Sequence, residues 1–343
     1  MTCTVAELDA SRWERWEAYV AAHPDATFFH RPGWKNVIEK SFGQGTRYLC
    51  AERNGALCGI LPLAHYKSRL FGNALISNGC CMGGGPIADD DEAYRALDAR
   101  AIDLMAELGA GYVEYRCPAV RHPEWQCRDD LYALFERPIE TDPGQNLKRI
   151  PRKQRAVVRK ALESPLTDSV DPTVDRLYPL YALNVRNLGT PVFAKSYFAN
   201  LKAEFGADCD VLTVRDGEGP VSSVLSFYFR DRVMPYYTGA ESRARKLGAN
   251  DFMYWRLMCR AMERGCRVFD FGRSKVGTGP YAFKKNWGFE PVPAVHEFRM
   301  ADDRPLPEIN PTNPKYRLFI SMWKRLPLPM ANFIGPHIVR NIG

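Results

Sequence analysis

The alternation of apolar and polar positions predicts one order of elements that occurs twice along the chain. In the first half, two β-rich runs flank a turn at 53–55, and a helix, a glycine stop at Gly109 and a strand at 112–116 follow. The turn carries Asn-Gly, which is a strong signal for a β-hairpin. The second half repeats this order with a turn at 215–217, a further strand, and a helix that begins near Asn250 and leads into a strand.

The two helix–strand segments align with each other without a gap. Glu107 aligns with Glu263, Gly109 with Gly265, and Glu114 with Asp270. Because hairpin, helix and strand recur in the same order about 156 to 162 residues apart, the pattern favours duplication of one α/β domain.

The predicted fold is therefore α/β (α+β), with two similar domains built on mixed, twisted sheets that are flanked by helices. A stretch that contains Pro and Gly at 138–144 marks the boundary between the halves. We expect an N-terminal domain at 1–145, a C-terminal domain at 146–311 that begins with a basic helix, and an amphipathic tail at 312–343. Hydrophobic residues make up 45% and charged residues 25% of the 343 residues, which is typical of a globular protein with a large core.

Two helices are expected before the first hairpin. Trp13, Trp16 and Val20 have helical spacing, and a second helix is expected to begin after Pro32 and to end at Gly43.

Positive charge is concentrated in one segment. The net charge of +7 permits anionic partners without requiring nucleic acid, and no DNA partner is expected. Seven of the thirteen residues at 148–160 are Lys or Arg. A helix at 151–162 would place Arg152, Arg155 and Arg159 on one face, and three guanidinium groups in a row suit phosphate or carboxylate. A solvated helix face is the alternative, and the sequence leaves both open.

A glycine-rich basic loop follows the last strand of the second half, in "FDFGRSKVGTGPYAFKKNWGFEP" at 269–291. Glycines such as Gly277 and Gly279 expose backbone N–H groups that can bind an anion or a developing oxyanion. Arg273 and Lys275 lie in the loop, and two further lysines follow in a short aromatic helix. An ordinary strand-to-helix connection with surface lysines is the alternative.

Carboxylates near strand ends are candidates for acid–base chemistry. Asp270 could orient or deprotonate an attacking amine, or could equally cap a helix or pair with an arginine. For Glu114 an arginine pair or a cap is the preferred interpretation. Gly248 and Asn250 could bind phosphate at a helix N-terminus, or Asn250 or Asp251 could simply cap the helix. No HExxH, GxSxG or P-loop occurs, and the six histidines have no metal-like spacing, so no metal is expected.

Four segments together resemble the FemAB-related proteins, in particular the branch associated with exosortase/PEP-CTERM systems and exopolysaccharide loci. They are "FFHRPGWKNVIEKSFG", "GILPLAHYKSRLFGNALISNGCCMGGGPI", "RIPRKQRAVVRKA" and the 269–291 segment. The resemblance covers about residues 25–335 and implies a pair of GNAT-like acyltransferase domains. The best-known members of this family, the Fem peptidyltransferases, move an amino acid from aminoacyl-tRNA to an amine of a peptidoglycan precursor.

The resemblance also implies roles for individual residues. Phe283 and Lys284 match a Phe–Lys pair in which the lysine assists transfer, and the basic helix matches a stretch that faces a nucleotide-sugar acceptor. Arg245 and Gly248 match the first part of the loop that binds acetyl-CoA in GNAT enzymes, and Asn250 departs from it. The donor therefore stays open between aminoacyl-tRNA and an acyl-CoA, each a co-substrate and neither a permanently bound cofactor.

The predicted function is transfer of an acyl or aminoacyl group, without metal, to an amine or hydroxyl of a cell-envelope or exopolysaccharide precursor. The expected catalytic residues are Lys284, Asp270 and Tyr237. The residues expected to bind donor or acceptor are Arg273, Lys275, Gly277, Gly279, Phe283, Lys285, Trp287, Arg155, Arg159, Arg245 and Gly248. Replacing Lys284 with Ala is expected to abolish transfer with the melting temperature nearly unchanged.

Two other functions are compatible with the same residues. The chain could be a non-catalytic assembly factor of an exopolysaccharide or protein-sorting system, or it could bind tRNA without transfer. An anionic small molecule or a nucleotide-sugar is the expected substrate of the transferase, and tRNA is a possible partner.

The sequence predicts a cytoplasmic protein that can reach the inner face of the membrane. The N-terminus has acidic residues and no apolar run, and the ten cysteines form no CxxC pair. The tail mixes apolar and basic residues, namely Phe319, Ile320, Met322, Trp323, Leu326, Lys324, Arg325 and Arg340. It could lie on an anionic membrane surface or pack on its own domain.

Overall fold

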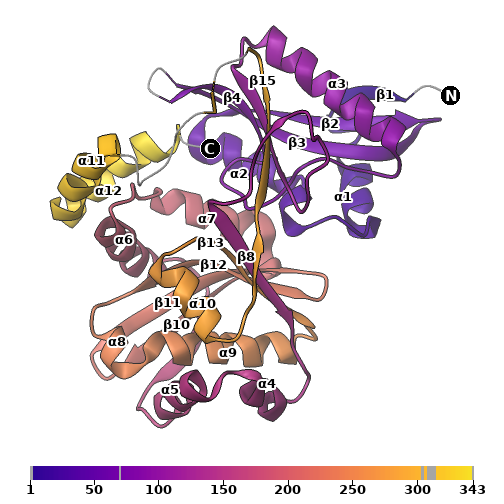
Figure 1. The fold of residues 1–343 in the computed structure, drawn as a ribbon. Coiled ribbons are helices and arrows are strands. Elements are labelled where there is room, and N and C mark those ends of the chain that lie inside the picture. The colour runs from indigo at the N-terminus through magenta and orange to yellow at the C-terminus, as the bar shows by residue number, and fades with distance from the viewer. Residues whose placement is uncertain (1–2, 69–70, 303–304, 307–313, 342–343) are drawn as a thin grey trace. The chain divides into compact units, whose positions relative to one another are not determined.

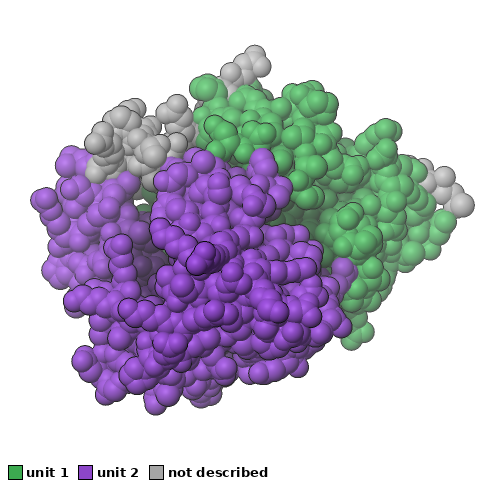
Figure 2. All heavy atoms as spheres, turned by 60° about the horizontal axis from the view of Figure 1, so that its bottom comes forward, with its two compact units in different colours: residues 1–130, 294–308, 337–343 green, residues 131–293, 309–336 purple. Residues whose placement is uncertain are grey.

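The computed structural model describes residues 3–68, 71–302, 305–306 and 314–341. The chain forms two compact units, coloured separately in Figure 2. Unit 1 comprises residues 1–130, 294–308 and 337–343, and unit 2 comprises residues 131–293 and 309–336. Each unit is a mixed β-sheet with helices on both faces (Figure 1).

Unit 1 is built on an eight-stranded sheet. Its strands, in spatial order, are β1 (Thr4–Glu7), β2 (Gly45–Arg53), β3 (Ala56–Ser68), β4 (Gly72–Ser77), β6 (Tyr112–Cys117), β15 (Val295–Met300) and β7 (Gln126–Arg128), and β5 (Ile87–Ala88) pairs with β3. The helices are α1 (Trp13–Ala22), α2 (Gly33–Phe42) and α3 (Asp91–Glu107). Leu49 and Ala51 of β2 lie in the core under α3, whereas Tyr48 stacks on Trp16 of α1, so the helices cover opposite faces.

Unit 2 is built on a seven-stranded sheet. Its strands, in spatial order, are β14 (Pro291–Pro293), β8 (Tyr132–Pro138), β13 (Val268–Lys275), β12 (Arg232–Ala240), β11 (Gly219–Phe229), β10 (Cys209–Asp216) and β9 (Thr167–Asp171). Its helices are α4 (Pro143–Arg149), α5 (Arg152–Leu162), α6 (Leu177–Leu188), α7 (Lys195–Phe205), α8 (Ala244–Leu247), α9 (Ala249–Glu263), α10 (Gly279–Asn286), α11 (Pro314–Arg325) and α12, which spans Leu328–Val339. In Figure 1, α9 runs along one face of the sheet with α4 and α5 beyond it, and α6 lies on the other face.

The two sheets have the same strand order. Each contains one parallel pair next to a run of antiparallel strands, β4 with β6 in unit 1 and β12 with β13 in unit 2. In each unit the helix before the second strand of that pair, α3 or α9, ends two residues before a glycine with positive φ, Gly109 or Gly265. This arrangement confirms the predicted repeat of hairpin, helix and strand.

The compact units depart from the predicted ranges of 1–145, 146–311 and 312–343. The strand β8 precedes the predicted boundary at 145 but pairs with β13 in the sheet of unit 2. The strand β15 precedes the predicted end at 311 but pairs with β6 in the sheet of unit 1. Each unit therefore receives one strand from beyond its own stretch of chain, and the tail residues 314–336 form helices that belong to unit 2.

Local signals placed the first elements correctly. Trp16 and Val20 are buried on α1, α2 ends at Gly43, and the hairpin β2–β3 turns at 54–55 as predicted. These elements follow from spacing and turn chemistry that act over a few residues.

Close packing of α6 on β12 depends on Gly239. A Cβ atom at this position would overlap the backbone of Leu180 and Tyr181 on α6. We therefore expect Gly239→Ala to lower the free energy of unfolding by about 1–3 kcal/mol, because the backbone of α6 would have to move. Gly217→Ala is the control, since a Cβ there meets nothing within 4 Å. Chemical denaturation of both variants measures the effect, and equal stabilities would contradict this account of the packing.

Candidate functional site

The parallel pair of unit 2 is joined over only two residue pairs. Arg232 pairs with Val268 and Val233 with Phe269, and no further residue pair joins these two described strands although β12 runs to Ala240 and β13 to Lys275. Both strands bulge directly after this point, β12 at Tyr236 against β11 and β13 at Phe271 against β8. Bulges next to an incomplete ladder are common where a sheet binds a ligand.

The corresponding place in unit 1 is closed by the chain itself. After β4 and β6 pair at three positions, the backbone N–H of Arg116 donates to Ser77 Oγ at 2.8 Å. Gly85 N donates to the Arg116 carbonyl oxygen at 3.1 Å, and the Arg116 guanidinium donates to the carbonyl oxygen of Cys81 at 2.6 Å. The segment 77–85 therefore takes up the hydrogen-bonding groups of β6 that would otherwise lack partners.

The two aligned carboxylates have opposite environments. Burial disfavours ionised Glu114, but the charge of Arg116 and the hydrogen bond with His296 hold its pKa at about 2. Burial raises the pKa of Asp270 to about 6, opposed by the hydrogen bond that Gly272 N donates to Asp270 Oδ1 at 2.8 Å. The arginine pair preferred for Glu114 is confirmed, and Asp270 is left as a carboxylate that can exchange a proton near neutral pH.

Lys284 of α10 is buried, with 9% of its surface exposed. Its Nζ donates to the carbonyl oxygens of Gly272 at 3.1 Å and Arg273 at 3.0 Å, on the part of β13 beyond the parallel ladder. Burial lowers the pKa of Lys284 to about 7, while the charge of Asp270 raises it and that of Arg273 lowers it further. An amine with a lowered pKa therefore lies beside the part of β13 that does not pair with β12.

Tyr237 lies on the face of the sheet opposite Lys284. Its hydroxyl is 2.8 Å from that of Tyr197 on α7, whereas Lys284 lies over the ring of Phe135, which belongs to the core under α9. The bulge at Tyr236 causes this, because one extra residue reverses which face each later side chain takes. The structure thus places Tyr237 in an aromatic cluster away from the lysine.

The other residues predicted from the glycine-rich loop divide into exposed and packed groups. Gly277, Gly279 and Lys285 are exposed, and Arg273 lies over the ring of Tyr132. Lys275 is partly buried, which lowers its pKa.

Two aromatic residues of α10 serve as packing contacts. Phe283 and Trp287 pack with Tyr254 of α9, and Trp287 Nε1 donates to Asp251 Oδ1 at 3.0 Å. Their role in this structure is to hold α10 on the α9 face.

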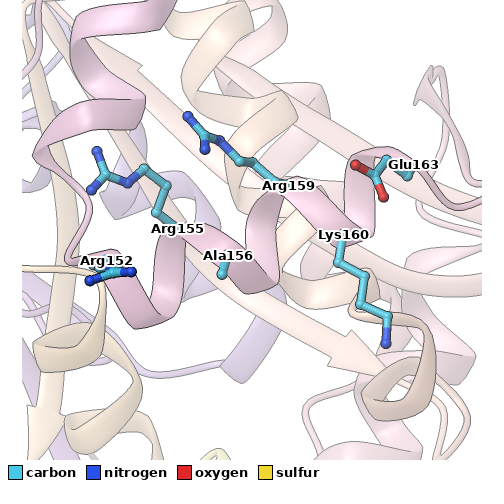
Figure 3. Close-up of a pocket in the computed structure, with 6 residues that line it drawn as sticks. All are labelled: Arg152, Arg155, Ala156, Arg159, Lys160 and Glu163. Atoms are coloured by element: carbon cyan, nitrogen blue, oxygen red, sulfur yellow. The ribbon is translucent and has the colours of Figure 1, made fainter.

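The basic helix α5 lines a shallow surface hollow with Arg152, Arg155, Ala156, Arg159, Lys160 and Glu163. Figure 3 shows Arg155 and Arg159 extending to one side of the helix and Lys160 to the other, with Ala156 between them. Val158 and Ala161 are buried on the opposite face, whereas Arg152 and Arg159 are exposed and Arg155 is partly buried, as expected of a binding surface or a solvated helix. Arg245 is exposed on α8, and Gly248 meets Ala161 of α5.

Sequence reasoning missed the partners that define this site. Gly272 and Arg273 accept from Lys284 through backbone oxygens, and backbone groups leave no trace in side-chain motifs. Asp251 was weighed only as a cap, yet its side chain accepts hydrogen bonds from Gln154 and Trp287, which link α5 and α10 to α9. The sequence signal that could have indicated this role is an acidic residue, Asp251, in the first turn of a helix rich in apolar residues.

The burial of Lys284 makes a prediction about stability. Between about pH 7 and pH 10 the unfolded chain holds a proton at this amine and the folded protein does not, so stability should rise with pH across this window. The free energy of unfolding of the wild type should rise by up to about 1 kcal/mol per pH unit relative to that of Lys284→Met. Unfolding curves at pH 7 and pH 9.5 test this, with the exposed Lys285→Met as control.

A constant difference between wild type and Lys284→Met across that window would show that the amine is not titrating there. The expectation that Lys284→Ala leaves the melting temperature nearly unchanged does not fit a buried side chain with two hydrogen bonds, so its removal should alter stability as well as activity.

Comparisons with known proteins agree with this architecture. Residues 145–285 match the family model Acetyltransf_6, described as an acetyltransferase (GNAT) domain. A search of curated protein sequences gave no match.

Three solved structures share the fold. The crystal structure of FemX has a TM-score of 0.69 at 16% identity and covers 85% of this chain and 96% of its own. A tandem GNAT protein from the clavulanic acid biosynthesis pathway has a TM-score of 0.57 at 13% identity, covering 88% and 100%. The structure of L-PGS from Bacillus licheniformis has a TM-score of 0.55 at 14% identity, covering 93% and 98%.

These likenesses confirm the predicted fold class of two mixed sheets flanked by helices. The chain therefore has the fold of two tandem GNAT-like domains, and its residues 145–285 match the model of an acetyltransferase (GNAT) domain.

Proposed function

We propose that this protein transfers an acyl or aminoacyl group, through unit 2, to an amine or hydroxyl of an anionic cell-envelope or exopolysaccharide precursor. The donor class is an acyl-CoA or an aminoacyl-tRNA. The acceptor class comes from the resemblance to the exosortase/PEP-CTERM-associated FemAB-related branch and from the basic face of α5.

One observation carries the proposal, namely the incomplete ladder between β12 and β13. A parallel strand edge that stops pairing after two residue pairs has backbone groups that a bound, extended donor chain can satisfy, as peptides do when they add to a sheet edge. Unit 1 fills the equivalent edge with its own segment 77–85, so unit 2 is the better candidate for donor binding.

The chemical step would use Asp270 and Lys284 at that edge. The acceptor nitrogen or oxygen forms a bond to the acyl carbon, and its proton passes to the Asp270 carboxylate. The carbonyl oxygen of the tetrahedral intermediate carries negative charge, which protonated Lys284 stabilises. The bond from the acyl carbon to the CoA sulfur or to the tRNA oxygen then breaks, and the leaving group takes the proton that Asp270 accepted, which restores the carboxylate.

The basic helix α5 would hold the acceptor's phosphate groups. Arg155 and Arg159 extend to the same side of α5, and paired guanidinium groups bind phosphate oxygens in a bidentate manner.

The pH dependence of transfer tests the chemical step. Activity should rise as Asp270 loses its proton near pH 6 and fall as Lys284 loses its proton near pH 7, giving a narrow bell. Asp270→Asn should lower kcat by about 100-fold or more, whereas Glu290→Gln, at an exposed position of the same unit, should leave it nearly unchanged. Full activity in Asp270→Asn would remove this carboxylate from the mechanism.

Charge reversal on α5 tests the acceptor surface. Arg155→Glu with Arg159→Glu should weaken binding of a nucleotide-sugar by about tenfold or more, because two cations are replaced by like charges to the ligand. Lys148→Glu with Lys153→Glu is the matched control, since it changes the net charge equally and neither lysine lines the hollow. Isothermal titration at low and physiological salt measures the affinity of both variants for the nucleotide-sugar. An equal loss of affinity in the control would show that net charge, and not the positions of Arg155 and Arg159, causes the effect.

Ligand-dependent unfolding separates this function from its rivals. A transferase should be stabilised by CoA esters or by nucleotide-sugars, as any ligand that binds only the folded state raises its stability. An assembly factor should respond to neither, and a protein that only binds tRNA should show steeply salt-dependent RNA affinity without product.

A further inference from the structure

The helices α11 and α12 expose an unusual set of large apolar side chains. Leu318 is 70% exposed, Met322 63% and Phe333 74%. With Phe319 and Met330 they make five of the large apolar residues that are exposed on the described part of the chain. Because Phe319 stacks on buried Trp323, we call the other four residues, Leu318, Met322, Met330 and Phe333, the apolar face. Water-exposed apolar groups gathered on one element mark a surface that is covered in use.

The hairpin that carries this face is packed firmly on unit 2 by its other side. Trp323 and Ala331 are buried, and Arg186 of α6 donates to the carbonyl oxygens of Lys324 and Leu326. On α11, Leu318 and Met322 are four residues apart and so share one side of the helix, away from buried Trp323. The apolar face is therefore presented by ordered helices.

All charged residues of the segment that carries the apolar face are positive. The sequence 314–343 contains five Lys or Arg and no Asp or Glu, and Lys324 and Arg325 are exposed at the end of α11. Together with the seven basic residues of 148–160, these account for 12 of the 47 Lys and Arg, which leaves 35 against 40 Asp and Glu in the rest of the chain. Outside these two segments the chain is thus net negative.

Exposed apolar residues next to basic residues favour one kind of partner surface over another. A second copy placed symmetrically would bring the same unneutralised cations together, which is unfavourable. An anionic bilayer surface offers both an apolar layer and phosphate groups within a few ångströms of each other. None of the described helices is long and apolar enough to cross a membrane, so contact would be at the surface.

We propose that the α11–α12 hairpin docks this protein on an anionic lipid bilayer. Leu318, Met322 and Phe333 would enter the boundary between headgroups and acyl chains, and Lys324 and Arg325 would bind lipid phosphates. This docking is independent of the transfer reaction proposed for unit 2.

Vesicle co-sedimentation of the full chain tests this docking. Wild type should bind vesicles of phosphatidylcholine with phosphatidylglycerol much better than pure phosphatidylcholine, and rising salt should weaken the binding. The variant with Lys324→Glu and Arg325→Glu should lose about fivefold or more in affinity per residue changed. The variant with Leu318→Gln, Met322→Gln and Phe333→Gln should lose about tenfold or more.

Controls separate docking from general stickiness. Val170→Gln with Val292→Gln removes two exposed apolar side chains of unit 2 on the edge strands β9 and β14, and it should bind vesicles like wild type. All changed residues are exposed, so circular dichroism should stay the same. Equal binding to neutral and anionic vesicles, no binding to either, or concentration-dependent dimerisation that the triple Gln variant abolishes would each overturn the proposal.

Discussion

The structure depends on how the parallel strand pair at the centre of each sheet satisfies its backbone hydrogen bonds. Buried N–H and C=O groups must find partners, so a ladder that ends early has to be completed by something else. Unit 1 completes it with Ser77, the Cys81 carbonyl and Gly85 around Arg116. Unit 2 has two residue pairs and then two bulged strands, with Lys284 bonded to two carbonyls of β13. The two units thus share one fold, but the ladder of the central parallel pair is completed by the chain in unit 1 and stops after two residue pairs in unit 2.

The environments of Lys284 and Asp270 in unit 2 differ from that of the aligned carboxylate in unit 1. A buried amine costs free energy unless its charge is reduced or its hydrogens are bonded, and Lys284 shows both effects. Asp270, close enough to alter that pKa, is itself shifted toward neutrality by burial. In unit 1 the aligned Glu114 is instead fully ionised by Arg116 and His296. The same strand position therefore holds a carboxylate paired with arginine in unit 1 and a carboxylate with a raised pKa in unit 2.

The features that were predicted correctly from the sequence are those set by residues close together in the chain. The hairpin at 54–55, the helix after Pro32 and the repeated helix–strand units follow from turn residues and periodicity. The placement of β8 and β15 in each other's expected domains could not be predicted, because it depends on pairing between strands more than a hundred residues apart. Tyr237 was expected beside Lys284, but the bulge at Tyr236 turns it to the opposite face, and a bulge leaves no clear sequence signal.

Net positive charge is concentrated in two segments of the chain. A chain whose basic residues were evenly spread would attract anions weakly everywhere, whereas here two acid-free segments, 148–160 and 314–343, stand against a net negative remainder. Both contribute helices to unit 2, the unit with the open sheet edge. Fields from such clusters raise the local concentration of anionic partners within about a Debye length, ~8 Å at physiological salt. An anionic acceptor and an anionic membrane surface would therefore be attracted to unit 2 by separate helices, α5 and α11. Higher ionic strength should weaken both attractions. Salt should screen the interaction between Lys284 and Asp270 far less, because burial separates them from the solvent ions.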